Sequence, residues 1–154
     1  MTKSINQFKK DWKIIRGRTI EFLKSVPKEK VSWSPHKDLG TIGMQIRHMC
    51  TSQEAYITGI KKGKIDFSDK YFDPKIEKNI DIGLKCLDKL DKELSELIEK
   101  ESLNKELIFI DGIEGSSKIT LQTALDYLMN HEFYHQGIFT CYGRLLNLGK
   151  FKFM

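Results

Sequence analysis

Apolar side chains recur at helical spacing through residues 120–146, and this feature constrains the fold of the chain most strongly. Positions three and four apart lie on one face of an α-helix. Thr120 precedes the stretch as a candidate N-cap. The face that we identify is apolar or aromatic apart from two histidines at its centre: Ala124, Leu128, His131, His135, Ile138, Tyr142 and Leu145. The pattern predicts a long amphipathic helix with both imidazoles pointing inward.

The two histidines permit two interpretations. His131 and His135 are one helical turn apart, about 5–6 Å between Cβ atoms, so both rings can reach one divalent ion. Burying two unpartnered imidazoles costs on the order of a few kcal/mol, and a metal ion removes that cost by accepting a lone pair from each ring. Core histidines satisfied by ordinary hydrogen bonds are the alternative. The residues of this helix alone are consistent with both metal-binding and hydrogen-bonded core histidines.

Residues 131–135 also spell H-E-x-x-H, the motif of zinc proteases. In those enzymes the glutamate is the general base and a third ligand lies downstream. After His135, however, this chain contains no aspartate, glutamate or histidine, and Gly137 is one place too early for the longer protease motif. The sequence therefore disfavours a protease, and any third ligand must come from upstream.

Two other stretches have the same helical period. Ser4 and Gln7 form a capping-box pattern that begins a first helix, and Pro27 ends it. Its apolar face comprises Ile5, Phe8, Trp12, Ile15, Thr19, Phe22 and Val26. Asp73–Pro74 is typical of a helix start, with proline at the first helical position. We expect one continuous long helix from there, with its face formed by Ile80, Leu84, Leu87, Leu90, Leu94 and Leu97.

A second helix is expected from Thr41, its N-cap, to about Lys62, with Gly63 as its stop. Its apolar face comprises Ile46, Met49, Tyr56 and Ile60. A neighbouring face combines a histidine with small and polar residues: Gln45, His48, Ser52, Ala55 and Gly59. Small residues either allow neighbouring elements to pack closely or leave room for a ligand in front of His48.

The connections complete the expected architecture. Residues 28–40 have no period and should form an ordered segment in which Trp33 closes one end of the core and His36 is exposed. Residues 64–73 should form a loop whose aromatic side chains cover the bundle: Phe67, Tyr71 and Phe72. The β-like run Leu107–Ile110 permits a short β-hairpin before the last helix. The fold class is therefore all-α, a four-helix bundle, with residues 1–154 as a single domain.

Composition excludes several functions. The net charge is +5, but lysines alternate with acids along solvated helix faces, which disfavours nucleic-acid binding. The N-terminal residues contain no uninterrupted apolar run, so neither a signal peptide nor a membrane span is expected. Three widely spaced cysteines, Cys50, Cys86 and Cys141, are typical of reduced thiols in a cytoplasm.

The chain resembles the DinB/YfiT-like superfamily of bacterial metalloproteins. The matching features are the Trp33-Ser34-Pro35 segment, the Gly40-Thr41-Ile42 helix start leading to His48, the Thr120-Leu121 start, and His131-Glu132-Phe133-Tyr134-His135-Gln136-Gly137. In that family a four-helix bundle holds a divalent metal with one histidine from the second helix and two from the fourth. The resemblance thus implies His48, His131 and His135 as ligands. Members commonly carry His-His-Arg-Gly-Gln near the second ligand, whereas this chain has Tyr-His-Gln-Gly-Ile at 134–138.

The resemblance also implies a function. We expect a metal-dependent enzyme, a low-molecular-weight-thiol S-transferase or a hydrolase, that uses zinc, nickel or iron and acts on a small molecule as a homodimer. Three neutral ligands leave an ion its full charge and an open coordination position. Gln45, Ser52 and Tyr142 lie about one turn from the ligands and are expected to bind substrate. One alternative is a non-catalytic metal- or small-ligand-binding protein induced by DNA damage or other stress. Another is a plain bundle with buried histidines and no metal.

Overall fold

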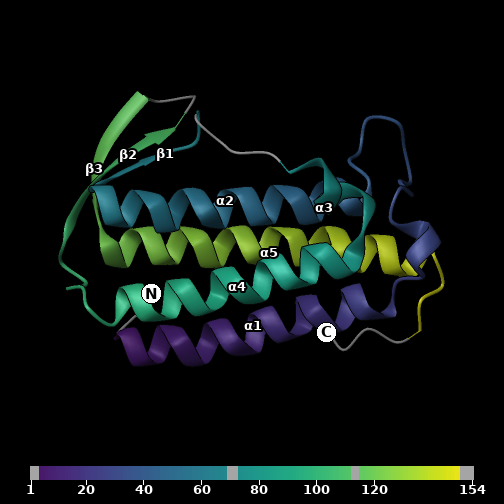
Figure 1. Cartoon of the computed structure of the whole chain (residues 1–154), viewed down its shortest axis with the longest axis horizontal. Helices are drawn as coiled ribbons and strands as arrows, with labels where there is room; N and C mark the ends of the chain where they lie inside the picture. The colour runs from purple at the N-terminus through teal and green to yellow at the C-terminus, as the bar shows by residue number, and fades with distance from the viewer. Residues whose placement is uncertain (1–3, 69–72, 112–114, 150–154) are drawn as a thin grey trace.

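Four long helices form a bundle in the structure, a computed structural model that describes residues 4–68, 73–111 and 115–149 (Figure 1). They are α1 (Ile5–Ser25), α2 (Ile42–Lys62), α4 (Ile80–Ile98) and α5 (Leu121–Leu145). The connections contain the 3-10 helix η1 (Lys28–Lys30) and the short helix α3 (Pro74–Lys78). The predicted four-helix bundle is confirmed.

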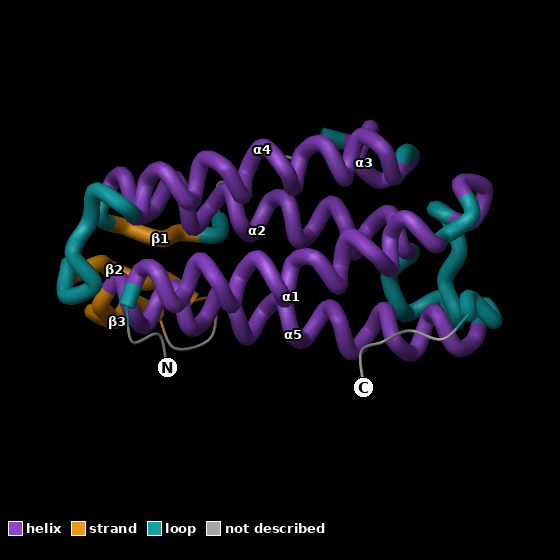
Figure 2. The backbone as a smooth tube through the Cα atoms, turned by 90° about the horizontal axis from the view of Figure 1, so that it is seen from below, coloured by secondary structure: helices purple, strands orange, loops and turns teal. Residues whose placement is uncertain are grey.

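The bundle is held by a core to which all four long helices contribute. Both α1 and α2 contact α4 and α5, and Figure 2 shows the four helices running side by side with the strands gathered at one end. Burying such large apolar side chains is the main favourable term in folding. The largest fully buried ones in the helices are Phe8, Phe22, Leu23, Ile42, Ile46, Met49, Ile57, Ile60, Leu87, Leu94 and Phe139.

Side-chain caps fix the helix starts where the sequence predicts them. The hydroxyls of Ser4, Thr41 and Thr120 each accept a backbone N–H from the residue three positions later. Gly63 ends α2 in the left-handed region at φ +79°, which glycine adopts without steric cost. The Gln7 side chain, which a capping box directs back to the backbone of the N-cap, instead donates from its side-chain amide to Asp11 Oδ1 at 2.8 Å.

The predicted long third helix is interrupted, and this part of the expectation was wrong. Asp73 does cap a helix, but that helix is α3 and ends after five residues. Asn79 then adopts an extended conformation at φ −150°, and its side-chain oxygen accepts the N–H groups of Asp81 and Ile82. Asparagine competes with helical hydrogen bonds in this way, so Asn79 both breaks the chain of helical residues and starts α4.

A small three-stranded sheet covers one end of the bundle. The predicted hairpin is confirmed as β2 (Glu106–Asp111) paired antiparallel with β3 (Gly115–Thr120). The segment expected to be entirely loop contributes a third strand, β1 (Lys64–Asp66), which pairs parallel with β2. Phe67 packs against Tyr56 with ring centroids 5.5 Å apart, as expected of a covering aromatic residue. Tyr71 and Phe72 lie outside the described residues.

Gly59 explains how the sheet approaches the bundle so closely. A Cβ atom at this position would lie 2.5 Å from Ile65 Cγ1 and 2.6 Å from Ile65 Cα. These separations are far below van der Waals contact, so only glycine allows β1 to pack here. For Gly59, close packing is therefore the correct interpretation of the small side chain.

The buried face of α5 is rotated slightly from the predicted one. Leu145, expected in the core, is 61% exposed, and His131 and Ile138 are half-buried at the border of the face. The buried line includes Leu121, Leu125, Leu128, Glu132, His135, Phe139 and Tyr142. Glu132 accounts for the difference near the centre of the helix, because polarity placed it on the solvent side in the sequence pattern. Near the end of the helix the buried line steps from Tyr142 to Leu146, which packs against the core, so Leu145 faces outward. None of the described helices is long and apolar enough to span a bilayer.

Candidate metal centre

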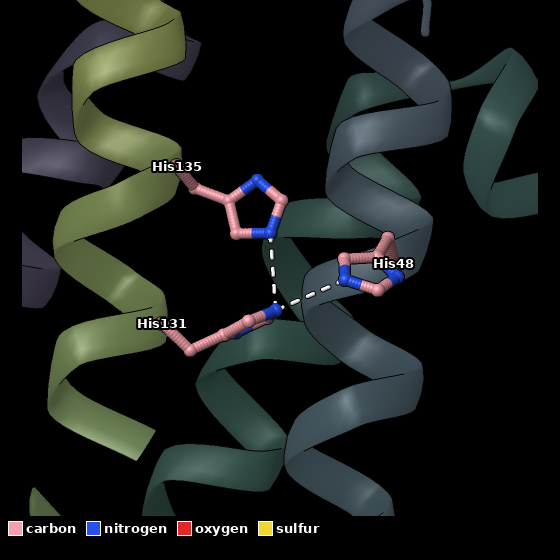
Figure 3. Close-up of side chains that lie close together, drawn as sticks. All are labelled: His48, His131 and His135. Atoms are coloured by element: carbon pink, nitrogen blue, oxygen red, sulfur yellow. Dashed lines mark hydrogen bonds between the residues drawn. The ribbon is translucent and has the colours of Figure 1, made fainter. Parts of the chain in front are cut away.

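Three histidines from two helices converge between α2 and α5 (Figure 3). His48 extends from α2, and His131 and His135 extend from successive turns of α5. His131 Nε2 lies 3.0 Å from His48 Nε2 and 3.2 Å from His135 Nε2. One ligand atom from each residue lies within 4.8 Å of the other two. The structure thus brings together the residues that the resemblance implies as ligands.

Hydrogen bonds cannot satisfy both of these nitrogen–nitrogen contacts well. Each imidazole nitrogen has either one hydrogen or one in-plane lone pair, so it is a donor or an acceptor but not both. His131 Nε2 makes both short contacts, and a single hydrogen or lone pair directs only one good hydrogen bond. The interpretation of the histidines as ordinary core residues therefore leaves one contact unsatisfied.

The spacing fits a metal ion better. Nitrogen ligands held about 2.0–2.1 Å from an ion at tetrahedral angles lie about 3.3–3.4 Å apart. The observed contacts of 3.0 and 3.2 Å are close to that separation. Ligation through Nε2 would place the remaining proton on Nδ1; His135 Nδ1 is buried without a hydrogen-bond partner in the described part of the chain, and an ion at Nε2 would leave that atom unchanged. The three residues present fit a divalent transition metal.

Burial keeps the innermost histidine neutral. His135 is 1% exposed, and desolvation, followed by the charges of His131, His48 and Arg16, lowers its pKa from 6.5 to about 3. A histidine must be deprotonated to bind a metal, so His135 is ready to do so at neutral pH. His48 and His131 are only half-buried. The cluster is therefore closed on the His135 side and more accessible at the other two histidines.

Glu132, the glutamate of the H-E-x-x-H motif, faces the core. Its carboxylate accepts from Arg16 Nη1, with Oε2 at 3.0 Å, and from the Thr19 hydroxyl, both on α1. Glu132 is 2% exposed, and burial raises the pKa of its carboxyl group against the opposing effects of Arg16 and Thr19. These contacts agree with the rejection of a protease, whose glutamate must face the reacting water.

The burial of Arg16 and Glu132 against each other was not expected from the sequence. Both are charged, and periodicity alone assigns such residues to solvent. The only available signal is their register, because Arg16 follows the buried Trp12 by four residues and Glu132 follows the buried Leu128 by four. That spacing places each charge on a core-facing line, where a buried partner is required.

The three predicted substrate-binding residues lie at different depths. Ser52 is buried in α2 one turn beyond His48. Tyr142 is buried and donates its hydroxyl to the Gly40 carbonyl at 2.6 Å. Burial raises the pKa of Tyr142, while hydrogen bonds with Ser34 and Gln45 act in the opposite direction. Gln45 and Tyr142 therefore meet beside the 33–41 segment, and the role of all three in substrate binding stays a prediction.

The two residues assigned to the 28–40 connection behave as expected. Trp33 is half-buried and contacts the Tyr142 ring edge-on, with centroids 5.5 Å apart. His36 has a 59% exposed side chain, and its Nδ1 lies 3.4 Å from Asp38. His36 is not among the three histidines that converge.

Comparison with known proteins supports the same fold. The sequence of residues 1–149 matches the family described as the DinB family. A DinB-like protein from Bacillus subtilis superposes with a TM-score of 0.73 at 19% identity, over 96% of both chains. A DinB-like protein from Bacillus cereus ATCC 10987 gives a TM-score of 0.72 at 18% identity, over 96% of this chain and 95% of that one. No curated protein matches the sequence.

Proposed function

The chain belongs to the DinB family, and we propose that His48, His131 and His135 hold a divalent transition-metal ion. One observation carries the proposal. His131 Nε2 makes two short contacts, to His48 Nε2 and His135 Nε2, and hydrogen bonding can satisfy only one of them. A shared ion would satisfy all three nitrogens with their lone pairs.

The donor set narrows the class of metal. Three imidazoles suit zinc, nickel and iron, and availability in the cell decides among such ions. When bound, an ion held by neutral ligands keeps its full positive charge and supplies a Lewis acid that favours the deprotonated form of a thiol or of water. The protein's contribution is to keep His135 neutral by burial and to fix its position in α5.

We further propose that the protein is a metal-dependent enzyme that transfers a low-molecular-weight thiol to a small electrophile, with hydrolysis as the other reaction that this site suits. The accessible side of the cluster supports a small-molecule substrate. His48 and His131 are half-buried, whereas His135 is 1% exposed, so a small molecule can approach the cluster from the side of the first two.

The experiment measures thiol transfer directly. Metal-free protein is loaded with zinc, nickel or iron(II) and incubated with a chlorinated aromatic electrophile and each of several cellular thiols. Turnover that requires both thiol and metal is the expected result. His135→Ala should abolish it, whereas His36→Ala is the matched control, because it removes an exposed histidine outside the cluster.

Two other outcomes decide against the enzyme. Saturable binding of metal and thiol without turnover would support the non-catalytic binding protein induced by stress. Equal turnover in the His135→Ala variant would show that the three-histidine site does not carry the activity. A hydrolase would be recognised by product formation that needs metal but no added thiol.

The oligomeric state, the location and the partners of the protein are also part of the proposal. We propose that the protein acts as a homodimer in the cytoplasm, without nucleic-acid or membrane partners. Light scattering of the purified protein tests the dimer, since a monomer at micromolar concentration would contradict it. Retention on a DNA column at physiological salt would contradict the absence of a nucleic-acid partner.

A further inference from the structure

A buried arginine connects the two helices that carry the histidines. Arg16 projects from α1, and its side chain is only 4% exposed. Its Nη2 donates to Gln53 Oε1 on α2 at 2.7 Å, and its Nη1 lies 3.0 Å from Glu132 Oε2 on α5. A third edge of the same guanidinium faces α4, where Nε lies 3.2 Å from Asp91 Oδ2. One side chain therefore contacts all three of the other long helices.

The partners of Arg16 are close to the histidines in the sequence. Gln53 follows His48 by five residues on α2. Glu132 stands between His131 and His135 on α5, and its carboxylate points toward α1. The Arg16 contacts thus link the part of α2 that follows His48 to the turn of α5 that carries His131 and His135.

We propose that Arg16 and Glu132 are positioning residues that hold α2 and α5 at the spacing which the three-histidine site requires. This inference rests on the proposed metal binding. The guanidinium is planar and directs its N–H groups in a rigid fork, so it fixes the direction as well as the distance of each partner. Sites of this kind need their ligands held within about 0.5 Å by a supporting set of contacts.

The surrounding contacts hold the arginine itself in place. Asp91 accepts from Trp12 Nε1 at 2.9 Å and from Gln53 Nε2 at 2.8 Å. The Trp12 ring lies under the guanidinium, with Arg16 Cζ 4.7 Å from its centroid. Thr19 donates its hydroxyl to Glu132 from the next turn of α1. The Arg16 charge is thus met by acids from α4 and α5 and by an amide oxygen from α2, so each of these helices is tied to the same guanidinium.

A purely electrostatic role predicts a different result, which makes the proposal testable. Arg16 is a cation near His135, so on charge alone its removal should strengthen metal binding. Glu132 is an acid, so on charge alone its neutralisation should weaken metal binding. Positioning predicts that both changes weaken it. The Arg16 variant therefore separates the two accounts by the sign of its effect.

The experiment compares zinc affinity in folded, metal-free full-length variants by competition with a chromophoric chelator. We expect Arg16→Met and Glu132→Gln each to weaken zinc binding at least tenfold. Ile98→Ala is the control, because it truncates a fully buried residue of α4 seven positions beyond Asp91 and lowers stability. Its zinc affinity should stay within about threefold of the wild type, which excludes a general effect of lost stability.

Cobalt(II) spectra provide a second readout. Weakened positioning should change the intensity of the visible ligand-field bands in Arg16→Met, whereas Ile98→Ala should retain the wild-type spectrum. If Arg16→Met does not fold, Arg16→Lys takes its place, since lysine keeps the charge but loses the fork, and the same weakening is expected. Wild-type affinity or tighter binding in the folded Arg16 variant would overturn the proposal. Failure of the wild-type protein to bind metal would instead overturn the proposed function.

Discussion

The Nε2 atoms of His48 and His131 lie 3.0 Å apart, although 83 residues separate the two histidines in the sequence. Their approach depends on how α2 and α5 pack, and each helix begins at a threonine cap that the sequence predicts. Packing at Gly59, the cap at Asn79 and the burial of His135 each give this bundle a property that can be measured.

Close packing at Gly59 makes this glycine hard to replace. We expect Gly59→Ala to destabilise the protein by about 1–3 kcal/mol, because the added methyl group would overlap the Ile65 backbone and side chain. Gly17→Ala is the matched control. A Cβ atom at Gly17 meets nothing within 4 Å, and alanine in a helix should stabilise by about 0.5–1 kcal/mol. Urea denaturation measures both, and equal effects of the same sign would contradict the packing account.

Asn79 caps α4 through two backbone N–H groups, those of Asp81 and Ile82. Removing a side-chain cap typically lowers stability by about 1 kcal/mol, so Asn79→Ala should show a loss of that size. Asn79→Asp keeps the acceptor oxygen and should retain the wild-type stability. Denaturant midpoints with an unchanged slope provide the measurement. An alanine variant as stable as the wild type would mean that the break between α3 and α4 has another cause.

His135 should make the metal-free protein less stable in acid. Its pKa is about 3 in the folded state and 6.5 ordinarily, because burial disfavours the charged ring. As the pH falls below 6.5, the unfolded chain binds a proton at this residue and the folded chain does not, so the free energy of unfolding decreases until about pH 3. One proton gives a slope of at most about 1.4 kcal/mol per pH unit.

The His135→Gln variant isolates this contribution. With chelator present, stability is measured from pH 7 to 4 for both proteins, and the wild type should lose more than the variant over this range. Parallel curves would show that His135 is protonated in the folded state near its ordinary pKa. Because other groups titrate in the same range, only the difference between the two curves tests the prediction.

Local patterns in the sequence were sufficient for the helices and most of their ends. Ser4, Thr41 and Thr120 each cap the helix that they were expected to cap, since capping depends on neighbouring residues alone. Inward-facing residues of α2 such as Ile46 and Met49 were identified by period for the same reason.

Features that depend on distant partners were not predictable in this way. Strand β1 has three residues and exists because it pairs with β2, whose first residue is more than 40 positions away. Glu132 and Arg16 are buried because each neutralises the other across 116 residues. The face of α5 was misplaced at Leu145 because Leu145 and Leu146 both fit a helical step from Tyr142, and only packing against the core selects Leu146.

Metal content of the purified protein tests the central claim most directly. Protein prepared without a histidine tag and dialysed against metal-free buffer should, after reloading with zinc, retain a single ion per chain when measured by mass spectrometry. His135→Ala should retain almost none, whereas His36→Ala should retain the wild-type amount. Stoichiometric zinc in the His135→Ala variant, or none in the wild type, would contradict the assignment of the three-histidine cluster as a metal centre.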